Sequence, residues 1–81
     1  MEQDDLLRRI EMNPNILVGK PVIKGTRLSV QFILHLLAHG ATIEEILSEY
    51  PKLTKNDILA CLLYASETLE TTTFMPLEKA V

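Results

Sequence analysis

Apolar residues recur at helical spacing directly after Ser29. Ser29 is a favourable residue for a helix N-cap, and Gly40 is typical of the left-handed position that follows a helix end. The positions between them are apolar except for a stripe of three polar residues, Gln31, His35 and His39. The pattern predicts a helix over about residues 30–39 that is buried over most of its circumference.

Two further helices are predicted from their start and stop signals. Thr42 and Glu45 have the spacing of a capping box, and Pro51 ends the helix that they open. Thr54 and Asp57 repeat the signal and open a helix that continues to about residue 69. Three helices of about 10, 8 and 15 residues predict a mainly α fold, a trihelical helix-turn-helix (homeodomain-like) bundle.

The last predicted helix carries more apolar surface than two short neighbours can cover. Ile58, Leu62, Ala65 and Leu69 share one face, which Leu59 and Leu63 broaden. A homodimer interface is the economical explanation, so we expect the protein to be a homodimer.

Helix signals are weaker before Ser29. Leu6, Leu7 and Ile10 predict a short helical lead within residues 1–12, which Asn13 and Pro14 end. Residues 16–28 alternate short apolar runs with Gly and Pro. They predict two or three brief extended segments, paired either as a small hairpin or across a dimer. The bundle therefore has a short N-terminal extended or β segment, and residues 1–70 form one domain.

Residues 71–81 are interpreted as a tail. Thr71, Thr72 and Thr73 favour extended structure, and Pro76 opposes a helix. The apolar residues Phe74, Met75 and Leu77 have no obvious core to join, so we expect them to bind a protein partner. The alternative is that the tail folds back onto its own helices or onto a sister subunit.

Composition agrees with a helical bundle and narrows the list of partners. Hydrophobic residues make up 47% of the 81 residues and aromatic residues only 5%, which indicates an aliphatic core. The net charge of −3 opposes strong non-specific binding to nucleic acid. However, residues 12–43 contain no acidic side chain, so the first half of the chain is basic and the second half is acidic. The acidic N-terminus and the absence of a long apolar run predict a cytoplasmic protein without a membrane span.

Candidate chemistry is sparse. Cys61 is the only cysteine and lies in an apolar run, where a small buried side chain is the favoured interpretation. His35 and His39 have the spacing of metal ligands, but no third ligand lies nearby in sequence. No motif for nucleophilic, metal-dependent or phosphate-binding catalysis is present. We therefore expect no catalytic residue, no metal, no cofactor and no enzymatic activity.

The start of the last predicted helix is the candidate DNA-binding site. In a helix-turn-helix the N-terminal residues of the last helix meet base edges, and here these are Thr54, Lys55 and Asn56. Asn pairs with adenine and Lys with guanine or phosphate, while Lys52 in the preceding turn suits a phosphate. Thr and Asn are also ordinary residues at helix starts, so this signal alone does not establish DNA binding.

A longer motif resembles the domain-of-unknown-function 433 family. It comprises Asn13-Pro14 and the string from Gly19 to Val30, followed by Gly40, Thr42-Ile43-Glu44-Glu45-Ile46-Leu47, Tyr50-Pro51 and Leu53-Thr54. The resemblance covers about residues 10–67. It implies a bacterial helix-turn-helix fold and a presumed antitoxin role beside a PIN-like ribonuclease toxin.

The signature residues of this motif are Gly19, Lys20, Pro21, Gly25, Thr26 and Arg27. Gly19 and Gly25 permit a positive φ, and Pro21 suits a strand edge. Arg27 offers a planar fork of donors, which either braces this segment or contacts a ligand.

The family resemblance implies an antitoxin of a type II toxin-antitoxin system. It would neutralise a PIN-like toxin by direct contact and could also repress its own operon by binding operator DNA. The alternatives are a stand-alone DNA-binding transcriptional regulator and a dimeric interaction module that does not bind DNA.

Overall fold

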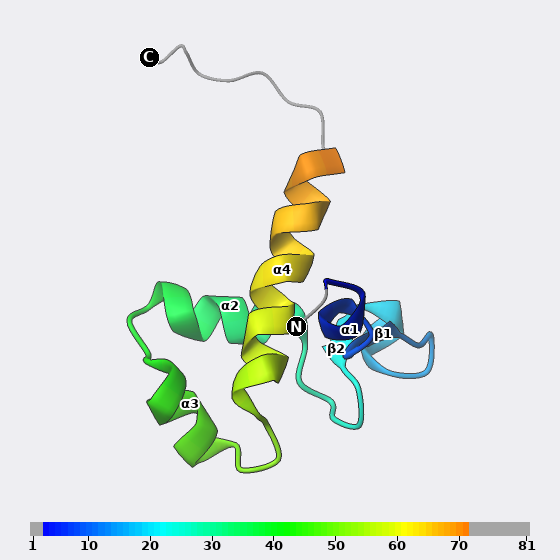
Figure 1. Ribbon diagram of the computed structural model, residues 1–81. Helices are drawn as coiled ribbons and strands as arrows, with labels where there is room; N and C mark the ends of the chain where they lie inside the picture. Colours follow the sequence, from blue (N-terminus) through cyan, green and yellow to red (C-terminus); the bar gives the residue numbers. More distant parts are fainter. Residues whose placement is uncertain (1–2, 72–81) are drawn as a thin grey trace.

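Three helices within residues 30–71 pack around one aliphatic core (Figure 1). The structure, a computed structural model, describes residues 3–71. The helices of the bundle are α2 (Val30–Ala38), α3 (Ile43–Glu49) and α4 (Lys55–Thr71). Before them come α1 (Gln3–Leu7), β1 (Ile10–Met12), the 3₁₀ turn η1 (Leu17–Gly19) and β2 (Pro21–Ile23). The predicted mainly α, trihelical helix-turn-helix bundle is confirmed.

The helix ends follow the capping signals in the sequence. The Ser29 hydroxyl accepts a hydrogen bond from the Phe32 N–H at 2.9 Å, and Gly40 follows α2 with φ +97°. At α3 the Thr42 hydroxyl accepts from the Glu45 N–H, while the Glu45 carboxylate accepts from the Thr42 N–H. Each cap satisfies backbone groups that the helix itself leaves unpaired, which explains why these boundaries were predictable.

The core is built from aliphatic side chains of every element of the bundle and of β2. Its fully or nearly fully buried members are Ile23, Val30, Ile33, Ile46, Leu53, Ile58 and Cys61. Phe32 and Tyr50 pack edge to face against this cluster, with ring centroids 5.9 Å apart. Burial of each large aliphatic side chain contributes about 1.5–3 kcal/mol, so this cluster is the main source of stability.

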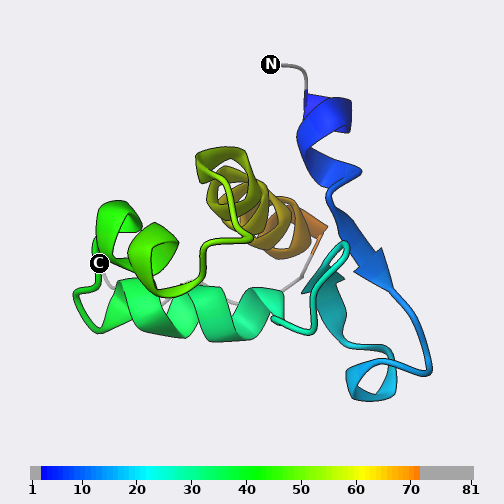
Figure 2. The same ribbon diagram turned by 90° about the horizontal axis from the view of Figure 1, so that it is seen from below.

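The N-terminal segment forms a small antiparallel sheet beside the bundle (Figure 2). β1 pairs with β2 in the register Ile10 to Ile23 and Met12 to Pro21. The predicted helical lead is therefore wrong beyond Leu7, because Ile10 lies in a strand. The reason is the non-local pairing with β2, which fixes residues 10–12 in an extended conformation.

The segment between the two strands differs from the predicted extended structure. Leu17, Val18 and Gly19 have φ values of +49°, +56° and +79°, so three consecutive residues adopt the left-handed conformation. Val18 is 93% exposed. A β-branched residue rarely adopts this conformation, in which it is strained. The apolar residues of this segment therefore predicted an extended strand that the structure does not contain.

α4 extends beyond the other two helices at its C-terminal end (Figure 1). Of the four residues predicted to share one buried face, only Ile58 is fully buried, and Leu62 and Leu69 are 44% and 61% exposed. The first half of α4 packs in the core through Ile58 and Cys61. No helix within residues 3–71 is long and apolar enough to cross a membrane.

Candidate nucleic-acid interface

The start of α4 is fixed by a second capping box. The Thr54 hydroxyl accepts a hydrogen bond from the Asp57 N–H at 3.3 Å, and one Asp57 carboxylate oxygen accepts from the Thr54 N–H at 2.9 Å. This box defines the direction in which the first turn of α4 leaves the preceding turn. The sequence signal for this helix start is confirmed.

The other oxygen of Asp57 is held by a residue far away in sequence. Arg9 Nη1 donates to Asp57 Oδ1 at 3.1 Å, and Asp57 as a whole is 8% exposed. The Arg9 Nε is buried and has no hydrogen-bond partner among the described residues. The Arg9 guanidinium therefore compensates the charge of the Asp57 carboxylate in the first turn of α4. Sequence analysis missed this contact because nothing local to residue 9 or 57 indicates it.

The predicted DNA-contacting residues lie together around this cap. Lys52, Thr54 and Lys55 are exposed, and Asn56 is half-buried. Within residues 3–71, the side chains of Lys52, Lys55 and Asn56 make no hydrogen bond or ion pair. The N–H donors of these three side chains are therefore available to a ligand. The Thr54 hydroxyl oxygen already accepts one hydrogen bond, from the Asp57 N–H in the cap.

The signature residues of the first half lie around β2 and the turn after it. Gly19 and Gly25 have φ values of +79° and +81°, a left-handed conformation that glycine adopts without steric cost. Pro21 is the first residue of β2. The Thr26 hydroxyl donates to the Ile23 carbonyl at 2.7 Å and accepts from the Leu28 N–H at 3.0 Å.

The two basic signature residues are exposed on different parts of the surface. Lys20 lines a groove between α2 and α4, whereas Arg27 lies beside the turn between α3 and α4. The Arg27 guanidinium makes no hydrogen bond or ion pair within the described residues, so its donors do not brace the turn in which it lies.

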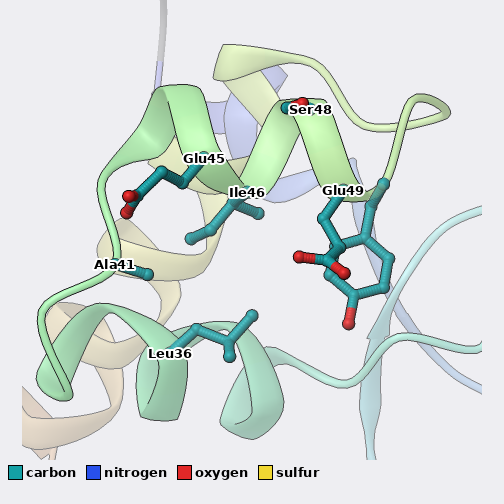
Figure 3. Close-up of a pocket in the computed structure, with 7 residues that line it drawn as sticks. Leu36, Ala41, Glu45, Ile46, Ser48 and Glu49 are labelled. Atoms are coloured by element: carbon teal, nitrogen blue, oxygen red, sulfur yellow. The ribbon is translucent and has the colours of Figure 1, made fainter.

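A cleft between α2 and α3 is bordered by acidic residues. Figure 3 shows Leu36 of α2 pointing toward Ile46 of α3, with Glu45 and Glu49 on either side of Ile46. The cleft has a volume of about 580 Å³. Glu45 is already committed to the cap of α3. The remaining lining mixes apolar and polar side chains.

A second groove, between α2 and α4, is lined mainly by apolar side chains. It has a volume of about 450 Å³, and its lining includes Leu34, Tyr64, Ala65 and the exposed Leu69. Ala65 and Leu69, two residues of the apolar face predicted for the last helix, line this groove.

Cys61, His35 and His39 are the residues that the sequence offered for nucleophilic or metal chemistry. Cys61 is fully buried, and burial together with the charge of Asp57 raises the pKa of its thiol from 9.0 to about 12. A neutral, buried thiol is neither a nucleophile nor a metal ligand. The rings of His35 and His39 stack at 4.1 Å, but no third ligand completes a metal-binding group within residues 3–71. Phe74, Met75 and Leu77, the expected toxin contacts, lie outside the described residues.

Comparisons with known proteins agree with the motif found in the sequence. The family model described as "Protein of unknown function (DUF433)" matches residues 10–65. An uncharacterized protein of Sinorhizobium fredii, y4eO, is 35% identical over 65 residues, covering 76% of this chain and 29% of its own length. The crystal structure of a DUF433 member from Anabaena variabilis superimposes with a TM-score of 0.74 at 30% identity, covering 83% of this chain and 66% of that one. The chain thus spans less than a third of the length of the curated relative.

Proposed function

The chain belongs to the DUF433 family, and on that premise we propose that it is an antitoxin that binds DNA through the start of α4 and binds a PIN-like ribonuclease toxin through its C-terminal segment. The observation that carries the DNA-binding part is the arrangement at the first turn of α4. Two exposed lysines and a half-buried asparagine surround a cap whose acidic residue is neutralised by Arg9. The protein acts by binding, without catalysis.

In this proposal α4 is the recognition helix. Asn56 reads an adenine edge in the major groove, Lys55 contacts a guanine or a phosphate, and Lys52 contacts a phosphate. The net charge of −3 keeps non-specific affinity low, so sequence-specific contacts carry more of the binding. A dimer formed through the second half of α4, where Leu69 is exposed, would bind two half-sites.

The antitoxin part rests on the family resemblance and on the composition of residues 72–81. A PIN-type nuclease gathers carboxylates around a divalent metal, so a segment laid over that site inhibits it. Phe74, Met75 and Leu77 supply the apolar contacts for such a segment. A stand-alone transcriptional regulator would share the DNA-binding site but would have no toxin gene beside its own.

Selection from a pool of randomised 30-base-pair duplexes tests the DNA-binding part. We expect enrichment of a defined sequence. Asn56→Ala should reduce discrimination at one base pair by about 1–3 kcal/mol, whereas Lys52→Ala should weaken binding to all sequences alike. Both variants should melt within a few degrees of the wild type, because neither side chain makes a hydrogen bond or ion pair within residues 3–71.

If no duplex is enriched, DNA binding is rejected and the dimeric interaction module becomes the better interpretation. Co-expression with the product of the neighbouring open reading frame, followed by pull-down, tests the antitoxin part independently. Co-purification of a PIN-like nuclease supports it, and failure of that nuclease to bind contradicts it.

A further inference from the structure

The turn that follows β2 is a hydrogen-bonded reversal of the chain that carries two cations, Lys24 and Arg27. Ile23 N–H donates to the Leu28 carbonyl at 2.9 Å, and Val22 bridges to Ser29, so the chain folds back on itself. Gly25 supplies the positive φ of the turn, and the Thr26 hydroxyl ties its two sides together. We call residues 24–27 the basic turn, because the exposed side chains of Lys24 and Arg27 project from a well-tied backbone.

The basic turn lies next to the start of α4. Figures 1 and 2 both place it on the side of the molecule where the chain passes from α3 into α4. Lys24 N–H donates to the Arg9 carbonyl at 2.8 Å, and the Arg9 side chain holds Asp57 in the first turn of α4. A cavity of about 470 Å³ separates the two turns, and its lining includes Arg27, Glu49 and Lys52. The two turns are thus held together by contacts that do not involve the cations themselves.

The charges at the start of α3 and at the cavity beside the basic turn differ. The first turn of α3 carries Glu44 and Glu45, both exposed, so a phosphate near that end would be repelled. The cavity between the basic turn and the turn before α4 is lined by two cations, Arg27 and Lys52, and by one acidic residue, Glu49, the last residue of α3. A phosphate at this cavity therefore meets more positive than negative charge.

We infer that the basic turn is a second DNA-contact site, in which Lys24 and Arg27 bind backbone phosphates of the duplex that α4 reads. This inference rests on the proposed DNA binding and adds residues that a helix-turn-helix alone does not supply. The Arg27 guanidinium presents a planar set of donors that suits a phosphate, and Lys24 adds a point charge. Such contacts fix the register of the protein on DNA and carry no sequence information.

Fluorescence anisotropy with the full chain tests the inference. The probes are the duplex enriched from the randomised pool and a shuffled duplex of the same composition, each titrated across a range of salt concentrations. Arg27→Ala should lower the salt slope of log affinity by about 1 for each bound protomer, which corresponds to on the order of eightfold weaker binding at about 0.1 M salt. The loss should be equal on both duplexes, and Lys24→Ala should act in the same direction. Glu49→Gln should strengthen binding to both.

Lys20→Ala is the control, because it removes one positive charge from the groove between α2 and α4, and sedimentation equilibrium checks that its oligomeric state is that of the wild type. It should leave the salt slope unchanged. If Arg27→Ala and Lys24→Ala behave like this control while Asn56→Ala still loses discrimination, the second contact site is rejected and DNA binding by α4 stands. If no duplex binds, or single-stranded RNA of equal length binds more tightly than either duplex, the inference is rejected together with its premise. Circular dichroism confirms that each variant remains folded.

Discussion

Arg9 and Asp57 form a 3.1 Å ion pair that joins the residue before β1 to the first turn of α4, across 48 positions of sequence. The Asp57 carboxylate therefore serves two structures at once. One oxygen completes the cap of α4, and the other anchors the N-terminal sheet to the bundle.

Removal of the guanidinium should leave the Asp57 carboxylate nearly buried with only its capping bond. We expect Arg9→Ala to lower the free energy of unfolding by about 1.5–3 kcal/mol, as for other hydrogen bonds to charged groups. Urea denaturation measures this change. Arg8→Ala is the control, because Arg8 is exposed and its nearest carboxylate, Asp5, lies 3.8 Å away. This variant should stay within about 0.5 kcal/mol of the wild type. Equal effects of the two variants would show that the Arg9 ion pair contributes nothing to stability.

The buried thiol of Cys61 gives a pH-dependent prediction. Its pKa in the folded protein is raised to about 12, so the neutral form stabilises the fold fully below about pH 9, and this contribution decreases as the pH rises toward 12. The stability difference between the wild type and Cys61→Ala should fall by at most about 1.4 kcal/mol per pH unit above pH 9. Urea denaturation at a series of pH values between 8 and 11 measures the difference. A constant difference over this range would contradict the raised pKa.

A charge placed on the exposed part of α4 tests the homodimer. Leu69 is 61% exposed and lines the apolar groove, so Leu69→Glu should shift the protein from dimer to monomer without lowering its helicity. Sedimentation equilibrium at micromolar concentration measures the oligomeric state. Val18→Glu introduces the same charge at an exposed apolar residue of η1 and should leave the dimer intact. A wild-type protein that is monomeric well above micromolar concentration would reject the dimer.

A chain that ends at Glu70 tests the role of the C-terminal segment. We expect it to keep the helicity and oligomeric state of the full chain and to lose binding to the PIN-like product of the neighbouring open reading frame. Circular dichroism and pull-down measure the two properties. If the shortened chain melts while its folded fraction still binds the nuclease, the segment belongs to the core and does not bind the toxin.

The helix boundaries could be predicted from the sequence, because each depends on residues that lie within one helical turn of each other. Ser29, the pair Thr42 and Glu45, and Gly40 act on backbone groups three or four residues away, so their residue types reveal them. The position of Lys55 at the start of a helix follows in the same way. Local signals therefore established the helix-turn-helix and the placement of its candidate DNA contacts.

The features that sequence missed depend on contacts between distant segments. Ile10 continues an apolar helical pattern, yet its pairing with Ile23 places it in a strand. The left-handed conformation of Val18 opposes its own propensity and is imposed by the connection between β1 and β2. The proximity of Arg27 to Lys52 likewise arises from packing of the basic turn against the turn before α4.

The ion pair between Arg9 and Asp57 also makes the charge at the start of α4 depend on the N-terminal segment. α4 can begin to form from its own capping box, but its first turn then carries a carboxylate, that of Asp57, without its Arg9 partner. That charge is neutralised only when the segment before β1 has docked, a step that closes a loop of 48 positions. A chain in which α4 has formed but the segment before β1 has not docked would therefore keep an uncompensated carboxylate in the first turn of α4.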